Sequence, residues 1–276
     1  MNPELHDILR LSGGGSYCEE IEDTSNIACA SKSLEHTLRI ILKNTRSMKS
    51  DERIFELESE LEGVHWDAVL VNETWRDERE EYMTLSSGNV WCGSGGTPGK
   101  HGVGILLHER WRKKISGWHA ISERLGLLEL KIGKIKLFLI VVYMPHTGYQ
   151  DSVVQDVYDK VSELLKLCGK SCITIVGGDM NAKVAAGGPG MFTSFGKYTN
   201  SVENSRGAWL KQWACQEDLV LANTFFKKRW NEIWTHECNK QQRQIDYIMV
   251  GRRHRSNIVN AGVLPSVNLG SDHRAV

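Results

Sequence analysis

The chain has 276 residues, and its 34 Lys and Arg residues balance its 34 Asp and Glu residues, so the formal net charge is zero. Hydrophobic residues make up 41% and charged residues 25%, which argues against a disordered, collagen-like or coiled-coil chain. No apolar run reaches the ~20 residues of a membrane span, so no membrane partner is expected. Zero net charge excludes a uniformly basic nucleic-acid coat but allows a local basic patch.

The seven cysteines and the N-terminus indicate a reducing compartment. The cysteine count is odd and no Cys-x-x-Cys occurs, so neither a disulfide framework nor a zinc finger is expected. The first residues lack the basic start and the apolar stretch of a signal peptide. We therefore expect free thiols and a nuclear or cytoplasmic protein that is not secreted.

Residues 1–35 are weakly patterned, and seven acidic residues face two basic ones there. This composition predicts a flexible acidic leader over 1–35. The pattern of apolar residues changes after this segment, and a folded domain is expected over 36–276. Short apolar runs in its first half predict strands over 38–42, 68–71 and 103–107, and a hairpin formed by 127–132 and 135–143.

Helices and loops are predicted between these strands. Ile54, Phe55, Leu57 and Leu61 recur at helical spacing and predict one amphipathic helix. The glycines between positions 88 and 104 predict a loop. The second half is expected to hold a helix over 153–168, with Asp151 as its cap and Gly169 after its end. A turn-rich loop over 187–190 and a second helix over 205–217 should follow. Strands are expected over 172–176, 219–222, 232–235 and 245–250.

Strands outnumber helices in this pattern, and several strands come in adjacent pairs. A parallel sheet with one helix per strand does not fit, whereas two packed sheets with helices outside do. The predicted fold is a four-layer α/β sandwich with two packed, mostly antiparallel sheets and outer helices. No glycine-rich nucleotide-binding motif occurs.

Polar side chains stand where predicted strands end, the place where rigid elements present groups to a cleft. Carboxylates beside apolar strands need a cation or a hydrogen-bond network. Oxygen ligands suit a hard ion such as Mg²⁺, and an Asp beside a His suits proton transfer, so together they suit metal-assisted phosphate-ester hydrolysis. The residues are Glu73, Asp179, Asn181, Asp246, Asp272 and His273.

Each of these residues also has an ordinary structural explanation. Glu73 could be a solvated loop residue, and Asp179 with Asn181 could form a turn with side-chain-to-backbone bonds. Asp246 could pair with an arginine, and the Asp272–His273 pair could lie on the surface. Their joint occurrence in this order favours the chemical interpretation.

Five segments carry a family resemblance, in order: Leu-Val-Asn-Glu-Thr-Trp (70–75), Val-Val-Tyr-Met-Pro (141–145), Gly-Gly-Asp-Met-Asn-Ala (177–182), Ile-Asp-Tyr-Ile (245–248) and Gly-Ser-Asp-His (270–273). On them the chain resembles the endonuclease/exonuclease/phosphatase family from about Leu38 to its last residue. This is the fold of pancreatic-type deoxyribonuclease and apurinic endonucleases.

Three further segments, 204–207, 219–226 and Trp-Thr at 234–235, look like the endonuclease domain of LINE-type (non-LTR) retrotransposons. Craniofacial development protein 2-like proteins belong to this branch. In such elements the domain nicks target DNA, and the exposed 3′ hydroxyl primes reverse transcription. The resemblance therefore implies DNA as a partner, and a reverse transcriptase domain of the same element as a second one.

The resemblance also implies a metal site. Glu73 would be the main ligand of Mg²⁺, with Mn²⁺ as a substitute, Asn44 would lie near the ion and Asp272 would support it. The segment around Asn44 reads Leu-Lys-Asn where the family usually has Trp-Asn. Thr235 and Ser271 would be supporting hydrogen-bond partners.

The implied catalytic residues are five. Asp179 would orient or deprotonate the attacking water, and Asn181 would hold the water and the scissile phosphate. His273, oriented by Asp246, would stabilise the phosphate or transfer a proton. Tyr143 would contact the phosphate through its hydroxyl. The family continues with a closing strand after this histidine, and we expect that strand to be cut short at Val276.

Charge is segregated along the chain. Residues 227–274 hold nine Lys and Arg against four acids, whereas 51–81 hold twelve acids against three Arg. Trp230 and Trp234 lie beside the basic stretch, and core packing is the simpler interpretation of both. The hypothesis is that basic side chains flank the cleft and contact the DNA backbone, namely Lys227, Lys228, Arg229, Arg252, Arg253 and Arg255.

The sequence therefore predicts a Mg²⁺-dependent endonuclease that nicks DNA, of retrotransposon origin. One alternative is a phosphoesterase of the same fold that acts on a small phosphate ester or a lipid headgroup. Another is an inactive relic that only binds a partner. The basic segment favours DNA, and the presence of all principal catalytic residues argues against the relic.

Overall fold

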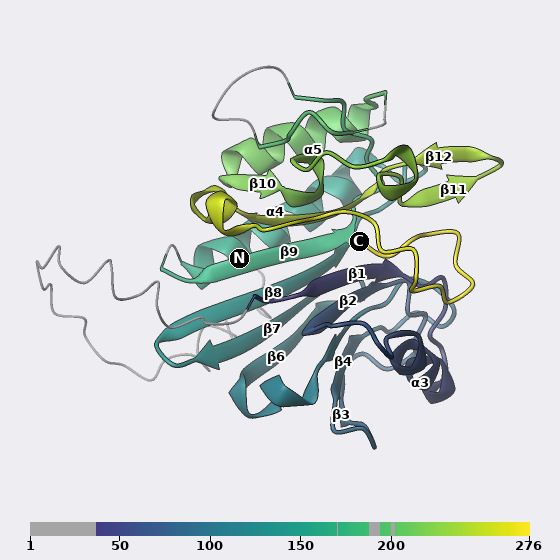
Figure 1. The fold of residues 1–276 in the computed structure, drawn as a ribbon, viewed down its shortest axis with the longest axis vertical. Helices are drawn as coiled ribbons and strands as arrows, with labels where there is room; N and C mark the ends of the chain where they lie inside the picture. Colours follow the sequence, from purple (N-terminus) through teal and green to yellow (C-terminus); the bar gives the residue numbers. More distant parts are fainter. Residues whose placement is uncertain (1–36, 170, 188–193, 200–201) are drawn as a thin grey trace, which may run out of the picture. The chain divides into compact units, whose positions relative to one another are not determined.

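The computed structural model describes residues 37–169, 171–187, 194–199 and 202–276, and Leu38–Val276 forms one compact unit (Figure 1). The predicted leader over 1–35 and most of the predicted loop over 187–190 lie outside the described residues. In the ranges that the structure describes, no helix combines the length and the apolar character needed to cross a membrane.

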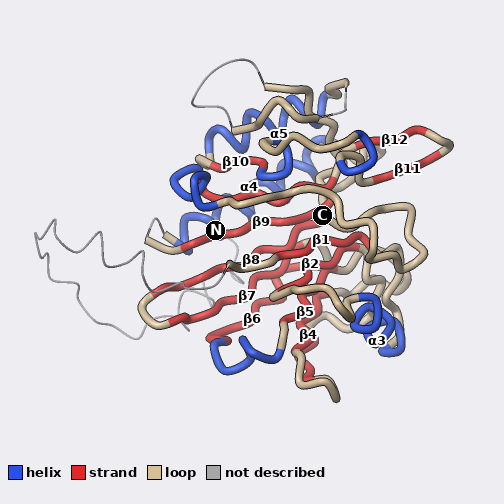
Figure 2. Tube along the Cα trace, viewed as in Figure 1, coloured by secondary structure: helices blue, strands red, loops and turns tan. Residues whose placement is uncertain are grey.

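The smaller sheet has five strands in the order β1-β2-β5-β4-β3. β1 and β2 are parallel, and every other neighbouring pair is antiparallel. Figure 2 shows these strands in red beside the larger sheet. Their bounds are Ile40–Asn44 (β1), Ala68–Asn72 (β2), Glu81–Thr84 (β3), Val90–Ser94 (β4) and Val103–Leu107 (β5).

The larger sheet has six strands in the order β10-β13-β9-β8-β7-β6, with only β8 and β9 parallel. A separate hairpin pairs β11 with β12. The bounds are Ile115–Ser122 (β6), Leu125–Ile132 (β7), Ile135–Tyr143 (β8), Ile173–Asp179 (β9), Leu219–Leu221 (β10), His236–Cys238 (β11), Gln241–Arg243 (β12) and Asp246–Gly251 (β13).

Within the described residues, three α-helices complete the layers: α3 (Asp51–Glu60), α4 (Asp151–Cys168) and α5 (Ser205–Gln216). α3 covers the outer face of the smaller sheet, and α4 and α5 lie against the larger one (Figure 1). The four-layer sandwich predicted from the sequence is thus confirmed. Short 3₁₀ helices fill the connections: η2 (Glu109–Lys114), η3 (Ala222–Thr224), η4 (Trp230–Glu232) and η5 (Arg252–Asn257).

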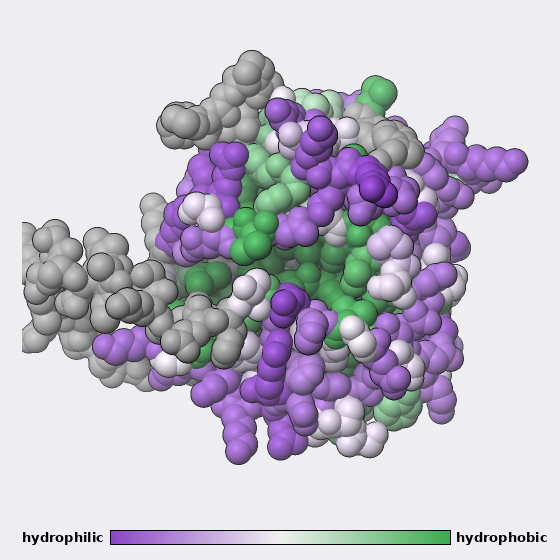
Figure 3. Space-filling view, in the orientation of Figure 1, coloured by the Kyte–Doolittle hydropathy of each residue, from purple (hydrophilic) through white to green (hydrophobic). Residues whose placement is uncertain are grey.

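The two faces of β2 explain the layering. Leu70 points into the core between the sheets, whereas Val69 and Val71 pack against α3, as the two-residue period of a strand requires. Burying each such side chain contributes about 1.5–3 kcal/mol. In Figure 3, apolar side chains show near the centre of this face, over the region where Figure 1 places β1 and β9.

Close contact between strands explains the Gly177-Gly178 pair of β9. A Cβ at Gly177 would lie 2.4 Å from Leu70 Cδ1 of the facing sheet, and one at Gly178 would lie 1.8 Å from the carbonyl oxygen of Val142. Only glycine fits there, so this pair sets the position of Asp179 at the end of β9.

Some local predictions were wrong. The stretch 88–104 was expected to be a loop, but it contains β4, which is fully buried. The part from 95 to 102 is irregular or turn backbone, as predicted, and Gly96, Gly99 and Gly102 have positive φ there. Gly95 serves close packing instead, because a Cβ there would lie 2.1 Å from the carbonyl oxygen of Arg76. The strand expected at 232–235 is instead the end of η4 followed by irregular backbone, and β11 begins at His236. β3 and β6 were not predicted at all.

Two helix details also differ. Gln150, not Asp151, precedes α4 and makes no side-chain cap hydrogen bond, while Asp151 is the first helical residue and pairs with Arg206 at 2.8 Å. Phe55 was placed on the apolar face of α3, but it is 44% exposed. Gly169 does follow the end of α4 with a φ of 71°.

The chain end is hydrogen-bonded on both sides. The amide of Val276 donates to the carbonyl oxygen of Leu42 in β1 and its own carbonyl accepts from the Leu42 amide, both at 2.9 Å. The amide of Arg274 donates to the carbonyl of Thr235. These bonds hold the backbone on the C-terminal side of His273 in place.

Candidate active site

Strand register brings the predicted residues together. Tyr143 ends β8 and Asp179 ends β9, and the two are paired across the parallel strands. Asp246 begins β13 and pairs with Asp179 from the other side. Glu73 follows β2 of the smaller sheet, so the side chains of both sheets converge at one edge of the sandwich.

A pocket of about 310 Å³ opens at this edge. Six predicted residues line it: Glu73, Tyr143, Asp179, Asn181, Asp272 and His273. Asp246 lies behind His273 and is buried. The structure therefore brings the predicted catalytic group together in one cavity.

Asn44 holds the two carboxylates of the pocket. Its Nδ2 donates to Glu73 Oε1 at 2.8 Å and to Asp179 Oδ2 at 3.1 Å. The Tyr143 hydroxyl donates to the same Glu73 oxygen at 3.1 Å. Asn44 Oδ1 accepts from the Arg46 amide at 3.1 Å, so Asn44 bridges the two carboxylates through its Nδ2. Its position between Glu73 and Asp179 keeps it where the resemblance expects a residue near the ion.

Asp179 is fully buried and surrounded by charge. Burial and the nearby Asp246 charge raise the pKa of its carboxyl, His273 opposes both, and the net result is a pKa of about 7. Its Oδ1 accepts from the Asn181 amide at 2.9 Å, while its own amide donates to Asn72 Oδ1 at 2.8 Å. The carboxyl is thus fixed in place and has the raised proton affinity of a group suited to handling a proton.

His273 is oriented by Asp246, as expected. Its Nδ1 lies 2.9 Å from Asp246 Oδ2, and its Nε2 lies 3.9 Å from Asp179 Oδ2. Burial lowers the pKa of His273, but the Asp246, Asp179 and Asp272 carboxylates together outweigh burial and raise it to about 9. Thr235 Oγ1 accepts from the amides of Ile245 and Asp246 and so fixes the start of β13.

The loop that carries His273 is tied to β1. Ser271 Oγ donates to the carbonyl of Asn44 at 2.7 Å and accepts from the His273 amide at 3.1 Å. The ammonium of Lys43, fully buried in β1, donates to the carbonyl of His273. Burial lowers the pKa of Lys43 to about 8.

Two site residues have a left-handed backbone, which is unfavourable for side chains other than glycine. Glu73 has a φ of 55° and Asn181 a φ of 47°. Such conformations cost about 1–3 kcal/mol and persist where the surroundings impose them, often at functional sites. Asn181 Nδ2 donates to the carbonyl of Met144 at 2.8 Å, which aims its side chain along the pocket wall.

The possible metal ligands group differently from the prediction. One atom each of Glu73, Asp179 and His273 lie within 4.8 Å of one another, and Asp272 belongs instead to a group with His236 and His273. Asp272 Oδ2 also pairs with Arg46 at 2.9 Å. Two carboxylates at a shared position fit a hard divalent cation, so Glu73 and Asp179 would hold it.

The predicted arginines of η5 do not flank this pocket. β13 runs from Asp246 at the site to Gly251, and η5 begins at the far end of that strand. There Arg252 pairs with Asp218, Arg253 bonds the carbonyl of Cys172, and Arg255 stacks over Phe225.

The other predicted basic residues, Lys227, Lys228 and Arg229, lie between η3 and η4 and do not line the described pocket either. Trp234 is 7% exposed with Arg274 over its ring, as core packing predicted, and the side chain of Trp230 is not described.

Several lining residues were not singled out from the sequence. Arg46, Lys183 and Arg243 bring positive charge to the wall, and His236 reaches it from β11. Signals did exist for two of them, because Lys183 directly follows the 177–182 motif and His236 directly follows Trp-Thr. Arg243 carries no local signal.

The fold and site define a class of protein: two packed sheets with carboxylates, an amide and a histidine at their shared edge. The profile of the endonuclease/exonuclease/phosphatase family matches residues 24–273. The chain therefore belongs to this family, whose members are hydrolases that act on phosphodiester bonds.

Among known proteins, craniofacial development protein 2 of Bos taurus is 26% identical over 234 residues, which are 84% of this chain and 39% of that protein. The same protein of Tragulus javanicus is also 26% identical over 234 residues, 84% of this chain and 40% of its own length. The chain thus spans about two-fifths of these relatives.

Solved structures share the fold. The endonuclease domain of TRAS1, a telomere-specific non-LTR retrotransposon, superposes with a TM-score of 0.59 at 13% identity and covers 87% of this chain and 96% of its own. An AP endonuclease from Leishmania major has a TM-score of 0.63 at 14% identity and covers 98% and 96%. The Neisseria 3′ phosphatase NExo, bound to product DNA hairpin, has a TM-score of 0.61 at 14% identity and covers 87% and 97%.

Proposed function

We propose that this chain is a Mg²⁺-dependent endonuclease that hydrolyses phosphodiester bonds of DNA and so nicks one strand. The observation that carries the proposal is the convergence of Glu73, Asp179 and His273 within 4.8 Å in a pocket whose wall holds three cations. The pocket then combines carboxylates that can hold an ion, a histidine that can take part in the reaction, and cations that can contact a phosphate backbone.

The carboxylates would hold Mg²⁺, and Mn²⁺ prefers the same oxygen ligands. When bound, such an ion supplies Lewis-acid stabilisation of the charge that develops on a phosphoryl oxygen. Asn44 keeps Glu73 and Asp179 at one position through its two hydrogen bonds. Asp272 supports the site indirectly, since it holds Arg46 at the wall.

The remaining residues act on water and phosphate. Asp179, whose pKa burial raises, orients the attacking water and accepts its proton. His273 presents Nε2 to the phosphate while Asp246 holds Nδ1, so a hydrogen bond to the developing oxyanion costs little reorganisation. Asn181 and the Tyr143 hydroxyl, both in the pocket lining, contact the phosphate.

DNA is the favoured substrate because Arg46, Lys183 and Arg243 surround the acids, and phosphate contacts by such cations dominate nucleic-acid affinity. The TRAS1 domain comes from a retrotransposon, and NExo is bound to product DNA hairpin. A reverse transcriptase of the same element is the corresponding protein partner, and the nucleus is the compartment where the substrate lies.

A phosphoesterase for a small phosphate ester or lipid headgroup is the second candidate. The observation that favours it is the pocket volume of about 310 Å³, which lies at the lower end of small-molecule sites. Three cationic side chains line the wall, and a polyanionic backbone engages several cations at once, so DNA remains the better fit.

Nicking of supercoiled plasmid tests the proposal. Mg²⁺ should support nicking and EDTA should abolish it, and Glu73→Ala and His273→Ala should each lower the rate by on the order of 10²-fold or more. Glu62→Ala is the matched control, because Glu62 is an exposed carboxylate beyond the end of α3. Absence of nicking by a folded, Mg²⁺-saturated chain would overturn the proposal, and hydrolysis of small phosphate esters would then identify the second candidate.

A further inference from the structure

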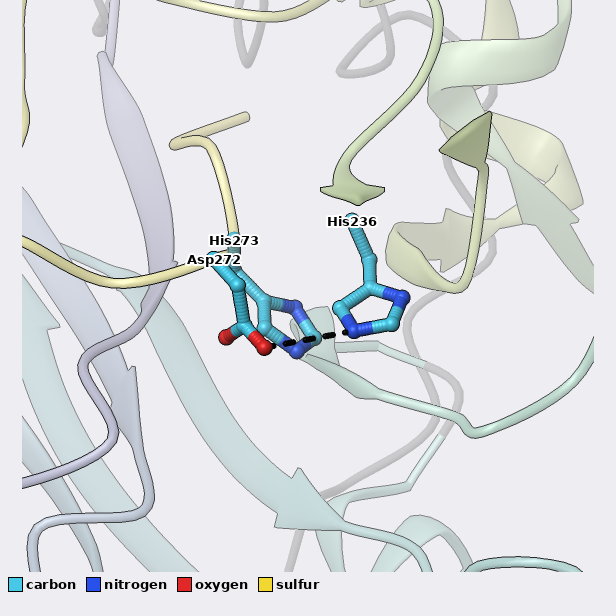
Figure 4. A group of neighbouring side chains, drawn as sticks. All are labelled: His236, Asp272 and His273. Atoms are coloured by element: carbon cyan, nitrogen blue, oxygen red, sulfur yellow. Dashed lines mark ion pairs between the residues drawn. The ribbon is translucent and has the colours of Figure 1, made fainter. Parts of the chain in front are cut away.

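A second group of possible metal ligands lies beside the proposed active site. His236 projects from β11, and Asp272 and His273 project from the C-terminal segment, so that the three side chains point toward one another (Figure 4). His236 Nε2 lies 3.5 Å from Asp272 Oδ2, and the two imidazole rings lie 4.5 Å apart between centroids. One ligand atom of each residue lies within 4.8 Å of the others.

We propose that His236, Asp272 and His273 bind a borderline transition-metal ion of the Zn²⁺ class, at a site distinct from the carboxylate position of Mg²⁺. Two imidazole nitrogens and one carboxylate oxygen are ligands that Zn²⁺ prefers, whereas Mg²⁺ prefers oxygen alone. Bonds of about 2.1 Å in a tetrahedron place ligand atoms about 3.4 Å apart. The separation between His236 and Asp272 already matches that distance.

The backbone fixes these ligands before any ion binds. His236 and His273 form an antiparallel bridge, and the amide of Glu237 donates to the carbonyl of Asp272 at 3.0 Å. Asp246 holds Nδ1 of His273 and leaves Nε2 for an ion, the carboxylate–histidine arrangement that supports metal ligands in many proteins.

Two buried atoms of the cluster lack partners. Nδ1 of His236 and Oδ1 of Asp272 make no hydrogen bond within the described part of the chain. Buried polar atoms are nearly always satisfied, so a buried carboxylate oxygen without a partner points to a bound species. An ion at Nε2 of His236 cannot also bind Nδ1 of the same ring, but Oδ1 of Asp272 belongs to the carboxylate that faces the site and can join Oδ2 as a ligand.

Arg46 is the competitor for this site. Its guanidinium lies 2.9 Å from Asp272 Oδ2, the same oxygen that faces His236. The Arg46 side chain is 54% exposed, so it can turn into solvent when an ion arrives. Arg46 therefore weakens binding of the ion, and its removal is expected to tighten it.

The consequence for activity rests on the proposed function. Nε2 of His273 is the nitrogen that would contact the phosphate, and a Zn²⁺ ion would take it. Binding at this second site should therefore inhibit Mg²⁺-dependent nicking, while binding itself requires no activity to be observed.

Isothermal titration calorimetry with ZnCl₂ on the whole chain, in excess Mg²⁺, tests the proposal directly. His236→Asn should weaken Zn²⁺ binding at least about tenfold, because one ligand is lost. Glu73→Gln should leave it unchanged, since Glu73 belongs to the other group. Cys238→Ser controls for the exposed thiol on the same strand and should also leave it unchanged.

Arg46→Gln provides a gain-of-binding test that misfolding cannot imitate, and it should tighten Zn²⁺ binding. The proposal is overturned if Zn²⁺ affinity falls in Glu73→Gln but not in His236→Asn, because the ion then sits at the carboxylates. It is also overturned if the wild-type chain binds no Zn²⁺. If the chain binds Zn²⁺ but does not nick DNA in Mg²⁺ without Zn²⁺, the proposed function is refuted and this site stands.

Discussion

Asp179 shows how a functional carboxyl lowers stability. Its ordinary pKa is near 3.9, and burial raises it to about 7 in the metal-free protein. The folded state therefore binds more protons than the unfolded state between these values. Stability consequently falls as pH rises from about 4 to 7, and above pH 7 the buried charge is fully unfavourable.

We therefore expect Asp179→Asn to stabilise the protein while it abolishes hydrolysis. In EDTA at pH 8 the variant should melt at a higher temperature than wild type, and this difference should shrink at pH 4, where Asp179 is protonated. Thermal unfolding followed by circular dichroism at both pH values measures the effect. An unchanged melting temperature at pH 8 would contradict the burial cost assigned to Asp179.

Asp246 is expected to act through His273. Against the lowering effect of burial, its carboxylate is the largest of those that raise the pKa of the imidazole to about 9, and it holds the ring at a distance of 2.9 Å. In Asp246→Asn the pKa of the His273 imidazole should fall, so the ring loses its proton at a lower pH. The alkaline limb of the pH–rate profile should therefore shift to lower pH. The rate should drop by on the order of 10²-fold or more, as for other oriented catalytic histidines.

A mutation beside Asp246 separates positioning from charge. Thr235→Val removes the oxygen that accepts from two amides at the start of β13 and keeps the carboxylate. It should lower the rate less and leave the alkaline limb in place. Equal shifts of the limb in both variants would show that His273 responds to backbone position and not to the Asp246 charge.

The two ends of β13 are expected to contribute differently to the proposed DNA binding. Lys183 and Arg243 line the pocket near its start, whereas η5 carries its arginines at the far end. Lys183→Gln and Arg243→Gln should each lower the salt slope of DNA binding by about 1, because each removes one phosphate contact. Fluorescence anisotropy with a labelled duplex over a salt series measures the slope.

Arg253→Gln and Arg255→Gln are the matched controls for this measurement, since they remove the same charge at the far end. Their slopes should stay at the wild-type value. A larger loss in the controls would place DNA along η5. A triple change of Lys227, Lys228 and Arg229 to Gln tests the remaining basic segment, and an unchanged slope there would exclude it from the contact surface.

Patterns of side chains predicted most elements of this fold. Apolar runs located β1, β2, β5 and β8, because each is buried on a face that the local sequence reveals. β4 was missed because the glycines in and around it indicated a loop, although Gly93 allows close contact with the Glu81 side chain and Gly95, just after the strand, with the backbone of Arg76. Glu81 and Arg76 are distant from these glycines in sequence, so no local pattern could show the contacts.

The residues of the candidate site also fall into those that a local sequence pattern reveals and those that it does not. Glu73, Asp179, Asp246 and His273 stand in ordered motifs, so the sequence located them, and the sheet register brings them together. The role of Asn44 could not be predicted, because the direction of its amide depends on two carboxylates from other strands. The sequence predicted basic residues of η5 beside the pocket, whereas Lys183 and Arg243 line it. Charge along the sequence does not show which end of a strand faces the pocket.

The two sheets meet at this site, because the smaller sheet supplies Glu73 and the larger sheet supplies Asp179. An ion held by both carboxylates would bind the folded state alone and add to its stability, by about 2.7 kcal/mol at a concentration 100 times the Kd. For a chain of this size, such a gain should raise the melting temperature by roughly 5–10 °C.

Differential scanning calorimetry in Mg²⁺ and in EDTA checks this expectation without reference to activity. Glu73→Gln should abolish the Mg²⁺-dependent rise, because it removes one of the two anchoring carboxylates, while Glu62→Gln should retain it. The two variants lose the same charge, so a difference between them reports the site and not the net charge. An equal rise in Glu73→Gln and wild type would mean that Mg²⁺ stabilises the chain elsewhere, and the two sheets would then not be joined through an ion at this edge.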